Sequence, residues 1–388
     1  MTTTTKTNAK NPVLKDARQI VIKAALLFLL FNFGFALLAP QAFLGRLSLY
    51  NRLFPGRLRL PYGDNPQQSY NLSLYNLEAM LASHHLAGTP KAPDEFRVIF
   101  IGDSATWGYL LPPEDTLTAQ INAANWTTAD GRRVRAYNLG YPVMSLTKDL
   151  LLLQRAMAYE PDLLVWPLTL ESFPQDKQLF PPLLQNNALA VRRLILTYNL
   201  NQDINDPVLQ DENFWARSLI GQRRNLADLI RLQLYGIMWA ATGIDHHIPP
   251  DFTPRMEDLP ADLLFHELSP PDLRASDLAF DVLAAGAQLT GDTPLLVVNE
   301  PMFISQGENS DIRYNFFYPR WAYDDYRRLL ADWTTAQNLP YLDLWDLVPG
   351  SEFTNSAVHM TAEGVALMAE SVGQALVQIA AMEGQTTP

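Results

Sequence analysis

The chain of 388 residues contains no cysteine. This absence excludes disulfide bonds, zinc sites built on thiolates and a cysteine nucleophile. Basic residues are also scarce: 29 lysines and arginines stand against 41 aspartates and glutamates, for a formal net charge of −12. So acidic a balance argues against nucleic acid as a partner, because phosphate contacts require a basic face. Apolar residues are plentiful at 48% of the chain, which is ample for a buried core.

The longest hydrophobic run lies near the N-terminus. The stretch "IVIKAALLFLLFNFGFALLA", residues 20–39, carries one charge, Lys23, close to its start. Twenty helical residues reach about 30 Å, the thickness of the hydrocarbon core of a bilayer. Because the run is long and no clear small-residue cleavage site follows, a transmembrane helix is favoured over a cleaved signal peptide.

Basic residues flank this run on both sides, so the positive-inside comparison is nearly balanced. They are Lys6, Lys10, Lys15 and Arg18 before it, and Arg46, Arg52, Arg57 and Arg59 after it. A lone N-terminal span usually serves as a signal anchor. We therefore expect a single-pass protein of the cell membrane, with residues 1–19 as a cytoplasmic tail and the main domain outside the cytoplasm.

The rest of the chain divides into a connector and a main domain. Residues 40–96 are interrupted by prolines and predict a membrane-proximal connector with one helix near 75–87. From residue 97 to 382, apolar runs typical of buried strands alternate with helical patterns. This alternation predicts an α/β domain with a doubly wound, five-stranded parallel sheet. The expected strands are 97–102, 133–140, 162–170, 294–301 and 340–345.

A long insertion, about residues 174–292, separates the third and fourth expected strands and far exceeds an ordinary crossover. It contains a helical stretch, Asn225–Ile244, whose apolar core is too short to span a bilayer. Packing on the main domain is the favoured interpretation of this helix, and a position on the membrane surface is the alternative. The adjacent His246 and His247 do not readily face one ion, so we expect no metal site.

A serine stands where the first expected strand ends. In "RVIFIGDSATWG" the apolar run stops at Gly102, and Asp103 and Ser104 follow. That position lies at the carboxyl edge of the sheet, where open α/β folds bind ligands. Ser104 needs a base to become a nucleophile. His359 follows the last expected strand, so its loop opens on the same edge. The alternative is that both residues merely cap helices.

Three stretches resemble sequence blocks of the SGNH/GDSL hydrolase superfamily. They are "GDSATWG", "YNLGYPVMS" and "HMTAEG". The resemblance covers about residues 97–172 and 293–380, and it implies the flavodoxin-like SGNH fold. It also implies Ser104 as the nucleophile, Gly140 as a donor to the oxyanion and His359 as the base.

Two positions depart from the family pattern. Glu171 stands where the family has an asparagine that donates to the oxyanion. A carboxylate donates only when protonated, and burial could keep it so. Ser356 stands where the family has an aspartate that orients the histidine. Asn355, Ser356, Glu352 or a backbone carbonyl remain candidates for that task.

The resemblance implies a membrane-anchored serine esterase or O-acyltransferase that needs no cofactor. Its substrates would be acyl esters, including those of cell-surface carbohydrates. The anchor and the divergent blocks resemble accessory proteins of polysaccharide or teichoic-acid acylation, which work beside membrane-bound O-acyltransferases. The alternative, indicated by Glu171 and Ser356, is an SGNH-like binding or assembly protein whose catalytic site has decayed.

Overall fold

The computed structural model describes residues 12–62, 75–209, 212–242, 251–271 and 273–386. Its strands form one parallel sheet in the order β2-β1-β3-β4-β5, which confirms the predicted sheet. Each strand lies within or beside its expected range. The strands are β1 Glu95–Phe100, β2 Arg133–Asn138, β3 Leu163–Leu168, β4 Leu295–Asn299 and β5 Tyr341–Asp343.

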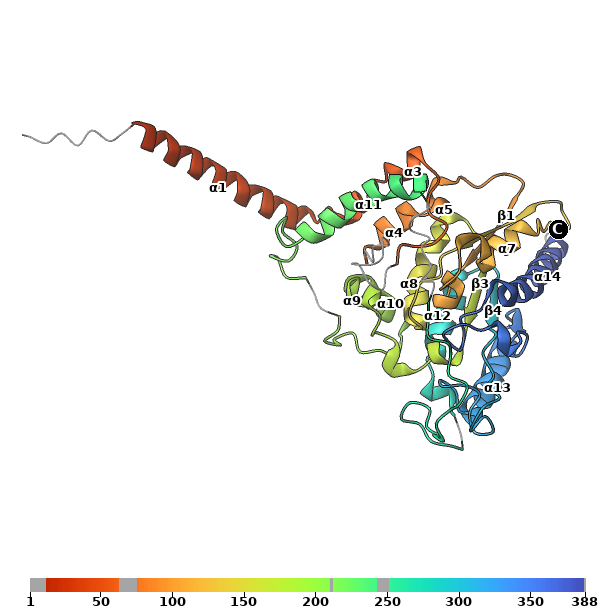
Figure 1. The fold of residues 1–388 in the computed structure, drawn as a ribbon. Coiled ribbons are helices and arrows are strands. Elements are labelled where there is room, and N and C mark those ends of the chain that lie inside the picture. The colour runs from red at the N-terminus through yellow and green to blue at the C-terminus, as the bar shows by residue number, and fades with distance from the viewer. Residues whose placement is uncertain (1–11, 63–74, 210–211, 243–250, 272, 387–388) are drawn as a thin grey trace, which may run out of the picture.

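The sheet is buried on both faces, and alternate side chains of each central strand enter different cores. In β1, Ile99 joins one core while Val98 and Phe100 join the other. This two-residue period follows from strand geometry. The first core is completed by α8 (Leu146–Ala156), α12 (Phe280–Thr290) and α13 (Arg320–Ala336). The second is completed by α7 (Leu117–Ala123) and α14 (Ala362–Thr386). The fold is therefore doubly wound (Figure 1).

Helix α1, Pro12–Leu38, projects away from the domain (Figure 1). Its part Asp16–Leu38 is long and apolar enough to cross a membrane, with a mean hydropathy of 2.3 in its best window, and is mostly exposed. Within the described residues, Ala362–Met382 of α14 meets the same criterion, but half of it is buried. Because α14 fills the second core of the domain, we treat it as a core helix.

The connector forms part of the domain core. It contains α2 (Gln41–Gly45), α3 (Tyr50–Leu53), α4 (Leu77–Ser83) and α5 (His85–Gly88). Leu60, Met80 and Leu86 are buried in the same core as β1 and α8. The expected helix near 75–87 is thus present in two pieces. The packing ties the connector to the sheet, and the domain boundary at residue 97 stays a prediction.

The insertion begins with α9 (Pro182–Gln185) and α10 (Ala188–Tyr198) and contains the expected longer helix as α11, Arg223–Thr242. Helix α11 packs against α3 of the connector. Tyr50 N donates to Gln233 Oε1 at 3.3 Å. Residues 243–250, which include His246 and His247, lie outside the described residues.

Candidate active site

The turn after β1 presents Ser104 at the start of α6, Ser104–Trp107. The cap of this short helix is Asp103, whose Oδ1 accepts from Ala105 N at 2.7 Å. Asp103 is buried, whereas Ser104 is half-buried at the carboxyl edge of the sheet. The capping alternative for Ser104 is therefore wrong, because the preceding residue takes that task.

Ser104 and His359 are hydrogen-bonded across 255 positions of sequence. The Ser104 Oγ lies 2.8 Å from His359 Nε2. The other ring nitrogen, Nδ1, lies 2.8 Å from Asn355 Oδ1. An amide oxygen only accepts, so Nδ1 carries the proton and Nε2 keeps the lone pair that accepts the serine proton. The three side chains form a relay in the geometry of a nucleophile, a base and an orienting group.

Of the three side chains that are candidates to orient His359, the structure places Asn355 at its ring. The loop is closed by Thr354 N, which donates to the His359 carbonyl at 2.8 Å, so Asn355 faces the ring. Glu352 instead accepts from Thr361 Oγ1 at 2.5 Å and from Ser351 Oγ at 3.0 Å. Ser356 makes no hydrogen bond to His359 in the part of the chain that the structure describes.

Tyr109 covers the imidazole ring of His359. The two rings stack with centroids 4.8 Å apart and planes inclined by 28°. The Tyr109 N–H donates to the Ser104 carbonyl at 3.0 Å, which ties the tyrosine to the nucleophile turn. Sequence reasoning missed Tyr109. Its only signal was its position five residues after Ser104.

Gly140 packs directly against α6. A Cβ at this position would lie 2.7 Å from Trp107 N, so only glycine allows this approach. The Gly140 N–H donates to Asn138 Oδ1 at 3.0 Å. An oxyanion would have to share this amide with Asn138. The Ser104 N–H is the stronger candidate donor, since first-turn amides have no acceptor within their own helix.

Glu171 belongs to an ion-paired cluster after β3. Its buried carboxylate contacts Lys177 Nζ and lies 3.2 Å from His266 Nε2. Burial lowers the pKa of Lys177, and burial together with the Lys177 charge lowers the pKa of His266. Two nitrogen partners suit an ionised carboxylate, which only accepts. This arrangement does not favour a neutral Glu171 that donates to an oxyanion. His266 is 95 positions away and could not be inferred from sequence.

Lys148 is fully buried beneath the site, on α8. Its Nζ donates to the carbonyls of Gly102 at 2.8 Å and Tyr141 at 2.6 Å, and it lies 2.6 Å from Asp149 Oδ1. Gly102 belongs to the turn that carries Ser104, and Tyr141 follows Gly140. One ammonium group therefore joins the two loops that carry Ser104 and Gly140.

Three buried carboxyl groups surround this lysine. Burial raises the pKa of Asp103 and raises the pKa of Asp149 to about 6. Burial and the negative charge of Asp103 hold the pKa of Glu300 well above its usual range. Burial therefore disfavours the charged forms of these three acids, and the positive charge of Lys148 offsets that effect only in part.

The raised pKa of Asp149 predicts a pH-dependent stability. A carboxyl whose folded pKa is near 6 and whose ordinary value is 3.8 favours folding most below 3.8. That contribution is lost as the pH rises through about 6. The free energy of unfolding of the wild type, relative to Asp149→Asn, should fall between pH 4 and pH 7 by about 2 kcal/mol, since each pKa unit of the full shift corresponds to about 1.4 kcal/mol. Urea titrations of both proteins measure it, and parallel curves would contradict it.

Arg59 of the connector holds the end of α6. Its Nη1 donates to the carbonyls of Gly108 at 2.8 Å and Leu111 at 3.1 Å. Its guanidinium also lies 4.2 Å from the centroid of the Trp107 ring. The connector thus supports the helix that begins with Ser104.

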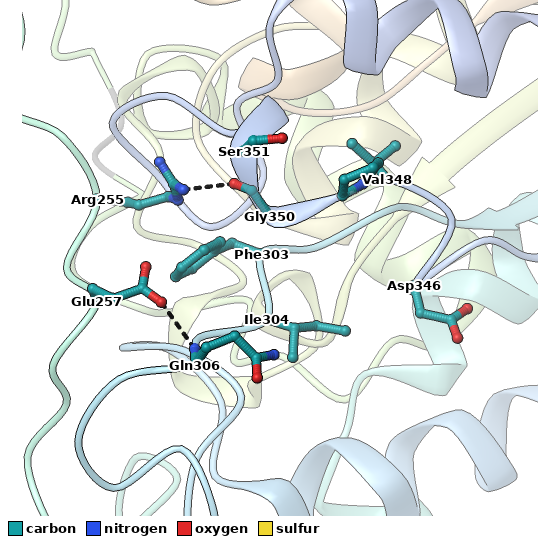
Figure 2. A pocket seen from close by; sticks show the side chains of 10 residues that line it. Arg255, Glu257, Phe303, Ile304, Gln306, Asp346, Val348, Gly350 and Ser351 are labelled. Atoms are coloured by element: carbon teal, nitrogen blue, oxygen red, sulfur yellow. Dashed lines mark hydrogen bonds between the residues drawn. The ribbon is translucent and has the colours of Figure 1, made fainter.

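A pocket of about 430 Å³ opens beside the loop that leads to His359 (Figure 2). Its walls come from the insertion, from the loop after β4 and from the loop after β5. Arg255 donates to the carbonyls of Phe353 and Gly350 at 2.7 and 2.6 Å and lies over the Phe303 ring. None of the relay residues lines this pocket. The hydrogen bonds of Arg255 tie the insertion to the base of the loop that carries His359.

Comparison with known proteins gives matches among solved structures only. No family model and no curated protein matches the chain. A member of the lipolytic protein G-D-S-L family from Veillonella parvula is 11% identical, with a TM-score of 0.33, over 72% of this chain and 96% of its own. A carbohydrate acetylesterase family member from Sinorhizobium meliloti is 12% identical, with a TM-score of 0.31, over 74% and 98%. A lipase/acylhydrolase from Enterococcus faecalis is 13% identical, with a TM-score of 0.34, over 73% and 96%. At such TM-scores no function is transferred from them, and the chemistry of this chain is argued from its own residues.

Proposed function

We propose that this protein is a serine ester hydrolase or O-acyltransferase. Ser104 is the nucleophile, His359 the base and Asn355 the residue that orients the base. The observation that supports this most directly is the relay itself, with 2.8 Å from Ser104 to His359 and 2.8 Å from His359 to Asn355. A half-buried serine at the carboxyl edge of the sheet is accessible to a substrate from the solvent side.

The relay accounts for both halves of an acyl transfer. Ser104 Oγ attacks the acyl carbon as its proton passes to His359 Nε2, and the carbonyl oxygen becomes an oxyanion. The Ser104 N–H stabilises that oxyanion, with the shared Gly140 N–H as a second donor. When the intermediate collapses, the leaving alkoxide takes the proton from His359 and the acyl group stays on Ser104. Water or a sugar hydroxyl then repeats the sequence in reverse, with His359 again as base.

The proposal extends to the location and the partners of the protein. Helix α1 anchors the chain in the cell membrane, with residues 1–19 in the cytoplasm, the span at 20–39, the connector at 40–96 and the catalytic domain at 97–382 outside the cytoplasm. The length, apolar composition and exposure of α1 support the anchor. Acyl esters of cell-surface glycans are the proposed substrates, and a membrane-bound O-acyltransferase is the proposed partner.

Covalent labelling by a fluorophosphonate probe tests the proposed chemistry. The wild type should be labelled and Ser104→Ala should not, because the probe reports an activated serine. If folded wild-type protein resists labelling from about pH 5 to about pH 9, the alternative of a decayed binding or assembly protein replaces the enzyme.

Asn355 offers a graded test of the orienting role. In Asn355→Leu the Nδ1 proton loses its acceptor, so we expect kcat/KM for a small acetyl ester to fall on the order of 10²-fold. Asn355→Asp keeps an acceptor and adds a charge that stabilises the imidazolium, so activity should be retained or increased. Steady-state kinetics with both variants measure the contrast. Wild-type rates in Asn355→Leu would remove Asn355 from the relay.

A further inference from the structure

Helix α11 turns its apolar side chains outward. Ile230 and Leu234 are 63% and 60% exposed, and Ile237 and Met238 are also exposed. Their spacing places them on one face of the helix. On the opposite face Leu232 is buried. A helix in a water-soluble domain has the reverse arrangement, with its apolar stripe toward the core.

The inner face of α11 is fixed by close packing on the connector. A Cβ at Gly236 would lie 2.4 Å from the Tyr50 ring, so the helix approaches α3 as closely as its backbone allows. The Gln233 side chain accepts from Tyr50 N. Because this contact sets the rotation of the helix, the outward direction of Ile230 and Leu234 is built into the fold.

The segment just before α11 contacts the proposed membrane span. The Asn32 side chain of α1 is buried, and its Oδ1 accepts from Ile220 N at 3.0 Å. The Phe33 ring lies 5.2 Å from Phe214 and 5.7 Å from Trp215, centroid to centroid. Figure 1 shows the start of α11 beside the C-terminal end of α1. Asn32 lies six residues before the end of α1, which is about 9 Å along a helix axis.

This contact sets the height of the segment relative to a bilayer. If α1 crosses the membrane with residues 20–39 in the hydrocarbon core, a contact about 9 Å from the helix end lies among the acyl chains, beneath the headgroups. Trp215 in this segment is 61% exposed, and tryptophan is enriched where acyl chains meet headgroups. Arg223 and Arg224 are exposed at the start of α11, where they can reach anionic headgroups.

We infer that Phe214–Ile220 and the outward face of α11 form a second membrane contact, in which Phe214–Ile220 reaches the acyl chains beside α1 and α11 lies in the interface of the same bilayer. Lipid is the occupant because this surface is continuous with the anchor and carries apolar side chains, an exposed tryptophan and arginines in the pattern of interfacial helices. The inference rests on the proposed anchor. A helix held this way fixes the orientation of the catalytic domain over the membrane.

The cysteine-free chain allows a direct test with single spin labels. Full-length Ile230→Cys and Leu234→Cys proteins are labelled and placed in nanodiscs of phosphatidylcholine and phosphatidylglycerol in equal amounts. Leu30→Cys, exposed on α1, serves as the reference inside the bilayer, and Glu370→Cys, exposed on α14, as the reference in water. Accessibility to oxygen and to a water-soluble nickel chelate is measured for each label.

We expect labels at 230 and 234 to be more accessible to oxygen and less accessible to nickel than the label at 370, at a depth shallower than position 30. Nickel accessibility equal to that of position 370, with position 30 protected, would overturn the second contact and leave the anchor intact. A water-exposed label at position 30 would overturn the anchor as well. If the labels at positions 230 and 234 are shielded from both reagents, the face is covered by a protein partner, and the inference that lipid covers it is wrong.

Discussion

Ser104→Ala is expected to lower kcat/KM for a soluble acetyl ester by about 10⁴-fold or more, the order found when a serine that works with a histidine is removed. The reason is that the Ser104 Oγ, 2.8 Å from His359 Nε2, is the atom from which attack begins in the proposed mechanism. Stability should change little, because Asp103 and not Ser104 caps α6. Initial rates and thermal unfolding of the same preparations measure both effects.

His359→Ala should lose as much activity as Ser104→Ala, and the double variant should lose no more than either single one. The two residues act as one unit, so their losses do not add. Tyr109→Leu is a matched control, since it removes the ring that stacks on His359 but leaves the relay in place. Near-normal turnover in His359→Ala would mean that another base activates Ser104.

Lys148→Met is expected to destabilise the fold by about 3–5 kcal/mol, the usual result of removing one partner of a buried ion pair. Asp149 would lose its cation, so its buried carboxyl would have to stay charged without a partner or take up a proton, and the carbonyls of Gly102 and Tyr141 would lose their donor. Urea unfolding measures the loss. Arg133→Met is the control, because Arg133 and its partner Asp94 are both more than half exposed, and the loss of an exposed ion pair should cost far less.

A double variant separates charge from packing in this cluster. Lys148→Met with Asp149→Leu removes both charges, so much of the lost stability should return. Activity should stay low in the double variant, because the loops that carry Ser104 and Gly140 are still no longer joined. A double variant no more stable than Lys148→Met would show that the ion pair is not the source of the effect.

The sheet could be predicted because buried parallel strands are continuous apolar runs. "VIFI" before Gly102 and "LLVV" before Asn299 are such runs, and each ends at a polar residue on the carboxyl edge. The pairing of Ser104 with His359 followed from the same topology, since loops after parallel strands open on one edge. The side chain that orients His359 could not be predicted from this topology. Three candidate side chains, those of Glu352, Asn355 and Ser356, stand within seven positions of His359, and only the path of the loop selects Asn355.

Other features depended on contacts that a local pattern does not record. Lys148 and Asp149 stand in an amphipathic helix, where charged residues ordinarily face water, and their burial depends on distant segments such as Trp166. Glu171 was identified as a departure from the family pattern, but its partner His266 lies far along the chain. The orientation of α11 likewise depends on Tyr50, which no periodicity in the helix reveals.

The hydrogen bonds from Arg59 to the end of α6 set a limit on how far the protein can be shortened before the turn at Ser104 loses its support. A fragment cut at residue 97, where the strands begin, would lack the guanidinium that holds Gly108 and Leu111 and the carbonyl of Leu60 that accepts from the Trp107 indole. A fragment cut after α1 would keep both. The segment that carries Arg59 and Leu60 is therefore part of the support of the site, and it cannot be exchanged without disturbing the turn at Ser104.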